Sequence, residues 1–183
     1  MFPVYLALGS NIGDKWGFLK TALTAINELP GTRIDAISPV YETLPYGVTD
    51  QGDFLNLIAR VETGFVPEKL LVELKSIERT TGRQERKRWF EREIDIDILL
   101  YGDVVIKSEK LNIPHLELEK RDFFLLPLLD LDPAIRLPGS GIFPRDLQIT
   151  REKPYIKGLS RKFFELRNGL VCLNEPRDQL HSG

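Results

Sequence analysis

Two aspartates separated by one residue are the clearest candidates for chemistry in this chain. Asp95 and Asp97 alternate with isoleucines in the stretch EIDIDILLYG, residues 93–102. This alternation predicts a strand with both carboxylates on one face, about 7 Å apart at the backbone. Two such charges repel one another unless water or a cation lies between them. Because carboxylate oxygens are suitable ligands for Mg²⁺, the pair is a candidate metal site. The alternative is an edge strand whose acidic face is simply exposed to solvent.

A strongly cationic segment leads directly into this strand. Residues 83–92, RQERKRWFER, combine basic side chains with two adjacent aromatic residues. A solvated surface loop is the ordinary explanation of such a run. Because this loop adjoins the paired carboxylates, however, cations and metal ligands would flank one pocket. A nucleoside triphosphate, neutralised from both sides, is the natural occupant of such a pocket.

Another stretch carries an unusual mixture of side chains on one face. Residues 54–63, FLNLIARVET, predict a strand in which Phe54, Asn56, Ile58 and Arg60 point one way. The opposite face is entirely aliphatic and belongs in a core. An aromatic ring, an amide and a cation on one face favour a small-ligand surface.

The remaining chain supplies the elements that must position these groups. In chain order we expect a strand over 2–8, a helix after Asp14, strands over 33–43 and 54–63, a helix opened by Pro67 and closed by Gly82, and the acidic strand. The turn at 9–14 lacks the Gly-Lys-Ser/Thr ending of a phosphate-binding loop, so it predicts only a tight strand-to-helix turn. The order β-α-β-β-α-β predicts an α+β, ferredoxin-like sandwich with a mainly antiparallel sheet. Its helices are expected on one face, which leaves the other for a ligand.

Composition and charge narrow the class of protein. The length of 183 residues suits a single domain over 1–183, although 138–183 form a C-terminal extension whose role stays open. A net charge of −2 argues against a general nucleic-acid or membrane binder. One cysteine, Cys172, excludes an intrachain disulfide, and neither a signal peptide nor a membrane-length apolar run is present. We therefore expect a cytoplasmic protein that binds small molecules; its oligomeric state is not readable.

Taken together, these stretches resemble one family, the 6-hydroxymethyl-7,8-dihydropterin pyrophosphokinases of folate biosynthesis. The matching motifs follow the family order over roughly residues 4–133: LALGSNIGD, SPVYET, LPYG, QGDFLN, TGR, RW, EIDIDILLYG, IPH and KRDFFLLPLLDLDP. The resemblance implies a diphosphokinase that moves diphosphate from ATP to the pterin hydroxymethyl group and releases AMP. It also implies two Mg²⁺ ions, held by Asp95 and Asp97.

The same resemblance assigns roles to individual residues. Pterin is expected to stack between Phe54 and Phe123. Along its edge it is expected to meet the amide of Asn56 and groups at Thr43 and Tyr46. Trp89 is expected in the lid. Four side chains are expected to bind the phosphates and to act in catalysis: Arg83, Arg92, His115 and Arg121. Ile98 is expected to lie beside the nucleotide.

The chain departs from the family pattern in places. Phe90 and Glu91 replace a Gly-Pro pair in the lid, and Leu116 stands where an aromatic residue is common. Two other functions remain as alternatives. One is a metal-dependent nucleotidyl transferase that attacks the α-phosphate, and the other is a non-catalytic ferredoxin-like binding module.

Overall fold

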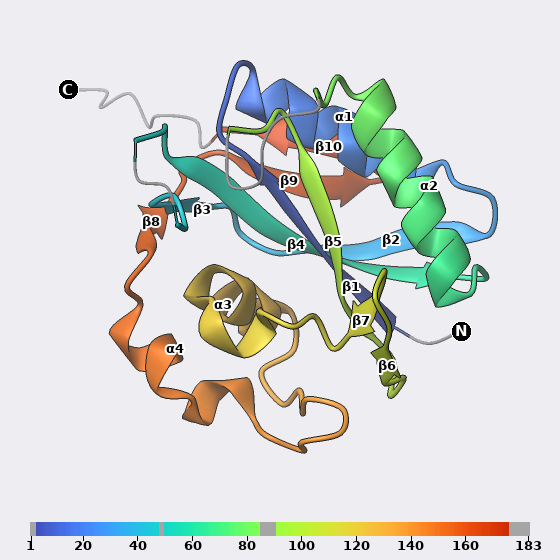
Figure 1. The fold of residues 1–183 in the computed structure, drawn as a ribbon. Helices are drawn as coiled ribbons and strands as arrows, with labels where there is room; N and C mark the ends of the chain where they lie inside the picture. Colours follow the sequence, from blue (N-terminus) through green and yellow to red (C-terminus); the bar gives the residue numbers. More distant parts are fainter. Residues whose placement is uncertain (1–2, 48–49, 85–90, 176–183) are drawn as a thin grey trace.

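An antiparallel sheet forms the centre of the molecule (Figure 1). The computed structural model describes residues 3–47, 50–84 and 91–175, and within them the sheet has six strands in the order β5-β1-β4-β3-β8, with β2 also paired to β4. The strands are β1 (Pro3–Ser10), β2 (Thr32–Ile37), β3 (Tyr41–Thr43), β4 (Phe54–Thr63), β5 (Asp95–Tyr101) and β8 (Ile156–Leu159). Two strands of two residues each, β6 (Ile106–Lys107) and β7 (Asn112–Ile113), form a small separate ribbon.

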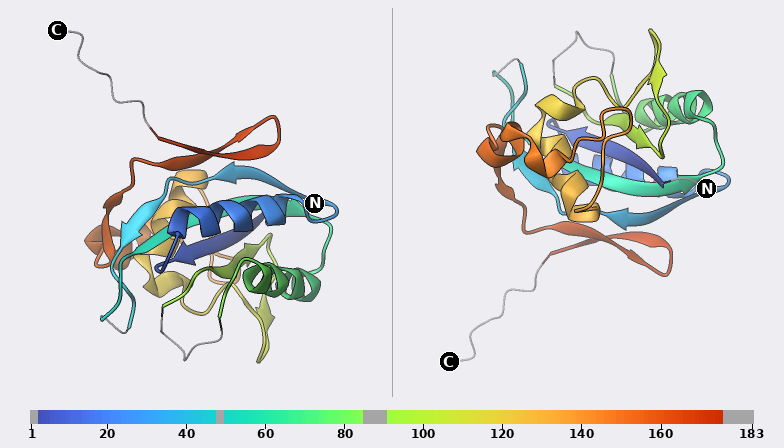
Figure 2. Two further views of the ribbon diagram at one scale, coloured as in Figure 1. Left: turned by 90° about the horizontal axis from the view of Figure 1, so that it is seen from above. Right: turned by 90° about the horizontal axis from the view of Figure 1, so that it is seen from below.

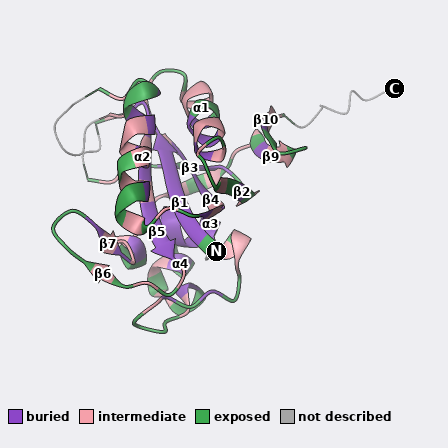
Figure 3. Cartoon of the chain, turned by 90° about the vertical axis from the view of Figure 1, so that its right-hand side faces the viewer, coloured by how far each residue is buried: buried purple, intermediate pink, exposed green. Residues whose placement is uncertain are grey.

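Two helices cover one face of this sheet. Helix α1 (Lys15–Asn27) begins as expected after Asp14, whose Oδ1 accepts a hydrogen bond from the Gly17 N–H at 3.0 Å. Helix α2 (Pro67–Thr80) begins at proline, which needs no N–H there. Their aliphatic residues join those of β1, β4 and β5 in the larger hydrophobic core. Figure 3 shows β1 and β5 buried, whereas α2 exposes its outer side.

The opposite face carries a second, smaller hydrophobic cluster. Helix α3 (Asp122–Leu131) packs there against β4 and β3, and α4 (Gln148–Glu152) lies beside it. Short 3₁₀ turns lie at Leu118–Lys120 and Pro144–Asp146. The predicted α+β, antiparallel ferredoxin-like architecture is confirmed, and α3 adds a helix on the face that was expected to receive a ligand.

The strand predicted over 33–43 is two strands separated by a break. Pro39 has no N–H to give to a neighbouring strand, and β2 ends just before it. Ser38 keeps the break attached to β4, since its N–H donates to the Ile58 carbonyl and its Oγ accepts the Ile58 N–H, both at 2.9 Å. Beyond the break, β3 pairs with β4 again and with β8 on its other side.

The segment after residue 138 completes the fold at two places. Strand β8 extends the sheet beside β3. A hairpin of β9 (Phe163–Arg167) and β10 (Leu170–Asn174) packs on α1 and β2, with the rings of Phe164 and Trp16 centred 5.6 Å apart. Figure 2 shows this hairpin on the side of the molecule away from α2. None of the helices in the described residues is long and apolar enough to cross a membrane.

Candidate active site

A cavity of about 430 Å³ opens on the ligand face, where β1, β4, β5 and the start of α3 meet. Twelve of the thirteen residues expected at a site line it: Thr43, Tyr46, Phe54, Asn56, Arg83, Arg92, Asp95, Asp97, Ile98, His115, Arg121 and Phe123. Trp89 lies outside the described residues. The fold therefore brings the predicted residues together in one cavity, while their individual roles remain predictions.

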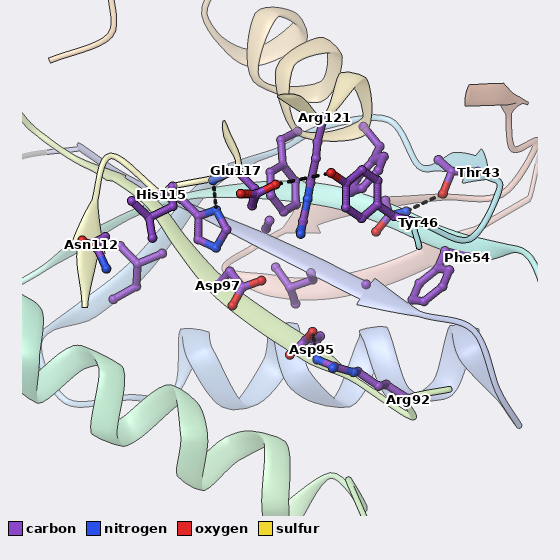
Figure 4. A pocket seen from close by; sticks show the side chains of 18 of the residues that line it. Thr43, Tyr46, Phe54, Arg92, Asp95, Asp97, Asn112, His115, Glu117 and Arg121 are labelled. Carbon is purple, nitrogen blue, oxygen red and sulfur yellow. Dashed lines mark hydrogen bonds and ion pairs between the residues drawn. The ribbon is translucent and has the colours of Figure 1, made fainter. Parts of the chain in front are cut away.

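Both aspartates face this cavity from β5, as the alternation predicts. Ile96 turns the other way into the larger core beneath α1 and α2, whereas Ile98 belongs to that core and also lines the cavity. The side chains of Asp95 and Asp97 are 24% and 30% exposed, so each carboxylate is partly screened from water. Figure 4 shows the pair between Phe54 at one end of the cavity and the histidine loop at the other.

Asp95 is held by two arginines. Its Oδ1 accepts from Arg83 Nη1 at 2.7 Å, and its Oδ2 accepts from Arg92 Nη1 at 2.5 Å. Burial alone would raise the pKa of the Asp95 carboxyl, but the surrounding cations outweigh burial and hold it below its usual range. For Asp97, burial and the negative charge of Asp95 raise the pKa. The second carboxylate thus has less cationic compensation than the first.

Aromatic rings gather at the start of α3. The rings of Tyr46, Phe123 and Tyr155 meet edge-on, with centroids 5.1 to 6.2 Å apart. The guanidinium carbon of Arg121 lies 4.6 Å from the Tyr46 ring centroid and 5.0 Å from that of Phe124, distances typical of cation–π contacts. Arg121 is therefore fixed by packing while it lines the cavity.

A polar edge lies beside these rings at the end of β4. Asn56 is 7% exposed, and its Nδ2 donates to Thr43 Oγ1 at 2.7 Å. Gly9 lies opposite Asn56 on β1, where an added Cβ would come 2.7 Å from Asn56 Oδ1 and 3.7 Å from the Phe54 ring. Glycine therefore leaves room for a flat ligand beside Phe54, with the amide oxygen available at its edge.

His115 lies in a loop, as predicted from its position after proline. Its Nδ1 accepts the Glu117 backbone N–H at 3.2 Å, and the backbone N–H of His115 donates to the Leu99 carbonyl at 3.0 Å. Burial lowers the pKa of His115, which favours the neutral imidazole. Since Nδ1 accepts a hydrogen bond, the neutral ring carries its proton on Nε2 and can act as a donor.

The family model for 7,8-dihydro-6-hydroxymethylpterin-pyrophosphokinase matches residues 5–133, a range that includes most of the chain and every residue that lines the cavity. The chain belongs to this family. It is 46% identical over 138 residues to the 2-amino-4-hydroxy-6-hydroxymethyldihydropteridine pyrophosphokinase of Aquifex aeolicus, with 75% of this chain and 85% of that protein covered. It is 42% identical over 142 residues to the protein of that name from Haemophilus influenzae, with 78% and 89% covered.

Solved structures support the pyrophosphokinase fold. The Plasmodium falciparum HPPK-DHPS triple mutant superposes with a TM-score of 0.67 at 19% identity. The match covers 93% of this chain and 48% of that one, so the chain spans about half the length of the HPPK-DHPS protein. The covered part extends beyond the family motifs into the C-terminal segment.

The donor set of this pyrophosphokinase fits a magnesium ion that binds together with a substrate. Within the described residues, no cluster of three or more His, Cys, Asp and Glu could hold a metal by itself. Asp95 and Asp97 offer two carboxylates whose repulsion a divalent cation would relieve. Mg²⁺ commonly takes one or two carboxylates and completes its shell with water and phosphate oxygens.

Helix α2 adds two charged residues to the pyrophosphokinase site that the sequence analysis missed. Glu78 is only 2% exposed, and it accepts from the Ile96 N–H and from Lys75 Nζ, both at 2.7 Å, and from Arg83. Lys75 lines the cavity. A signal was present, because Glu78 follows Leu74 by four residues on the apolar stripe of its helix. A carboxylate in that position needs a buried partner.

One departure from the family pattern can be located. Leu116 lines the cavity but is 68% exposed, so it presents an aliphatic side chain at the mouth. Glu91 lies among the described residues, next to Arg92, whereas Phe90 lies outside them.

Proposed function

We propose that this chain transfers diphosphate from ATP to the hydroxymethyl group of 6-hydroxymethyl-7,8-dihydropterin and releases AMP, as a step in folate biosynthesis. Two observations carry the proposal. The chain belongs to the family, and Asp95 and Asp97 lie between an aromatic slot and a group of cations. The pterin hydroxymethyl oxygen forms a bond to the β-phosphorus. The bond from the β-phosphorus to the bridging oxygen of the α-phosphate breaks, AMP leaves, and the hydroxyl proton is released.

The aromatic end suits the pterin. A flat heterocycle fits beside Phe54 and against Phe123, and each ring contact of this kind contributes on the order of 1–3 kcal/mol. Asn56 gives a hydrogen to Thr43, so its amide oxygen is directed to accept one from the pterin edge. Tyr46 closes the same side, and Trp89 is expected to complete the lid.

The charged groups around the two aspartates suit the phosphates. Arg83 and Arg92 pair with Asp95, and His115 and Arg121 act on Asp97. We propose that these four side chains bind the triphosphate, with Ile98 beside the nucleotide. When bound at Asp95 and Asp97, two Mg²⁺ ions would offset charge on the transferred group and orient the attacking and leaving oxygens. Arg92 is paired with Asp95 here, and a cation on that carboxylate would free it for phosphate, whereas Arg83 is also held by Glu78.

The proposal is tested by mass spectrometry of the products formed from hydroxymethyl-dihydropterin, ATP and Mg²⁺. Diphosphorylated pterin and AMP are expected with the wild-type chain. Asp97→Asn should lower their formation about 100-fold or more, because the second carboxylate is lost from the metal site. Asp103→Asn, the same change at an exposed residue just after β5, is the matched control.

The alternative functions predict different results. Attack on the α-phosphate would give a nucleotidylated product and free diphosphate instead of AMP. A binding module would give neither product, and calorimetry would detect no Mg²⁺-dependent ATP binding. Full turnover by Asp97→Asn would remove Asp97 from the proposed metal site.

A further inference from the structure

We propose that Lys75 acts as a fixed positive charge beside Asp95 and Asp97. This charge makes the binding of a divalent ion depend on the nucleotide. In this role its ammonium offsets part of the negative charge of Asp95 and Asp97 before any ion binds and weakens the attraction of a lone Mg²⁺. This inference rests on the proposed function, and it concerns a residue outside the set that the sequence analysis assigned.

The position of the Lys75 ammonium is fixed from two sides. Its Nζ donates to Glu78 Oε1 at 2.7 Å and to the Ile96 carbonyl oxygen at 3.1 Å. Glu78 is buried, so its charge must be compensated inside the protein, and Lys75 and Arg83 supply that compensation. Helix α2 runs beside β5, and these bonds tie the two elements together (Figure 1). Lys75 is therefore held and does not sample the cavity freely.

From this position the ammonium faces both carboxylates equally. Lys75 Nζ lies 4.0 Å from Asp95 Oδ1 and 4.0 Å from Asp97 Oδ1. That separation is too long for a direct hydrogen bond but short enough for strong attraction in a partly screened site. Two of the three ammonium hydrogens go to Glu78 and Ile96, which leaves one for the gap between the aspartates.

Lys75 differs from Arg92 in what holds it, and it shares its Glu78 anchor with Arg83. Among the described residues, the Arg92 guanidinium donates to Asp95, so an ion on Asp95 can release it toward a phosphate. Lys75 is anchored by Glu78 and a backbone carbonyl, neither of which is a proposed metal ligand. Its positive charge therefore stays beside the pair when an ion arrives. A lone divalent ion meets this repulsion, whereas an ion carried by a triphosphate brings negative charge that offsets it.

The test measures Mn²⁺ binding by electron paramagnetic resonance of the free ion, in the absence and presence of ATP. Lys75→Gln should bind Mn²⁺ without nucleotide about tenfold more tightly than wild type. The gain in Mn²⁺ affinity caused by ATP should shrink by the same factor. Lys69→Gln is the matched control, since it removes the same charge from an exposed residue of α2 that pairs with Glu73. Lys75→Arg should restore the wild-type values.

A gain of affinity separates this role from a purely structural one, because damage to the fold would weaken binding. Equal Mn²⁺ affinity in Lys75→Gln and Lys69→Gln would overturn the proposal, as would tight binding that survives Asp97→Asn in the Lys75→Gln background. If Lys75→Gln does not fold, Lys75→Met repeats the measurement with a side chain of similar length. Wild-type formation of AMP and diphosphopterin tests the underlying function separately, so the two failures are distinguishable.

Discussion

Asn11 holds Arg92 at the entrance to β5 through two hydrogen bonds. The Arg92 N–H donates to Asn11 Oδ1 at 2.7 Å, and the Asn11 N–H donates to the Arg92 carbonyl at 3.1 Å. The Asn11 amide also donates to Gln51 Oε1 at 3.1 Å and to the Gly52 carbonyl at 3.3 Å. One buried side chain thus joins the turn after β1, the loop before β4 and the residue that pairs with Asp95.

Asn11→Ala should therefore disturb catalysis more than pterin binding. The substitution removes the acceptor of the Arg92 backbone N–H and the donor to the Gly52 carbonyl. The free energy of unfolding should therefore fall by about 1–3 kcal/mol. Displacement of Arg92 should lower kcat about 10- to 100-fold. Steady-state kinetics and denaturant unfolding measure both effects.

Asn11→Asp serves as the comparison for this prediction. It keeps the oxygen that accepts from Arg92 and loses the donors to Gln51 and Gly52, so its kcat should stay closer to the wild-type value. A kcat in Asn11→Ala equal to that of wild type would contradict the positioning of Arg92 by Asn11.

Gly9→Ala should weaken pterin binding selectively. The new methyl group would come 2.7 Å from Asn56 Oδ1, a distance that forces the amide to move. We expect the KM for pterin to rise about tenfold, since loss of one well-placed hydrogen bond and of close packing has effects of this size, while ATP affinity is unchanged. Gly158→Ala is the control, because a Cβ there meets nothing within 4 Å in the same sheet. An unchanged KM for pterin would show that Asn56 does not border the pterin.

Local pattern was sufficient to predict β4 and β5 and the cavity positions of Phe54 and Asn56. Two other residues of the expected ligand face of β4 lie elsewhere, because Arg60 pairs with Asp35 and Ile58 joins the smaller core. The alternation in β5 separates Asp95 and Asp97 from Ile96, and the structure keeps that division. Alternation depends only on the two-residue repeat of a strand, so it can be read without knowledge of the neighbouring elements. Family resemblance then supplied the distant partners, such as Phe123 and His115.

Features set by the orientation of one element against another could not be predicted in this way. Lys75 reaches Asp97 only because α2 packs beside β5 with one particular side inward. The Asn11 bonds join three loops that are far apart in sequence. The C-terminal strands have short, mixed patterns, and β9 became distinguishable from a helix only through its pairing with β10.

Tyr41 should make the fold sensitive to alkaline pH. Burial and the hydrogen bond to Asp130 Oδ2, at 2.6 Å, raise the pKa of Tyr41. In the unfolded chain the phenol titrates near a pKa of about 10, so above that pH the unfolded state loses a proton that the folded state keeps. The contribution of Tyr41 is complete below about pH 10 and is lost as the pH rises.

The measurement compares wild type with Tyr41→Phe. Between about pH 9.5 and about pH 11, the unfolding free energy of wild type should fall by about 1 kcal/mol more than that of the variant. Urea unfolding at a series of pH values gives this difference. Parallel pH curves for the two proteins would contradict a raised pKa at Tyr41.

Tyr155 should connect the C-terminal segment to pterin affinity. Its ring packs against Tyr46 and Phe123, and its carbonyl accepts the Leu44 N–H at 2.8 Å. Asp122 Oδ2 accepts the Tyr155 N–H at 2.9 Å and so fixes the segment to the start of α3. Because the segment supports one wall of the aromatic slot, Tyr155→Ala should raise the KM for pterin about tenfold, as expected for loss of ring–ring packing.

ATP binding provides the internal control for Tyr155, since Arg83 and Arg92 are held by Asp95 and not by the rings around Tyr155. Tyr155→Phe keeps the ring and should retain nearly wild-type pterin affinity. Thermal unfolding of both variants reports whether the fold is intact. If Tyr155→Ala folds and binds pterin as wild type does, then Tyr46 and Phe123 hold their positions without the C-terminal segment, and its contribution is confined to the stability of the sheet edge.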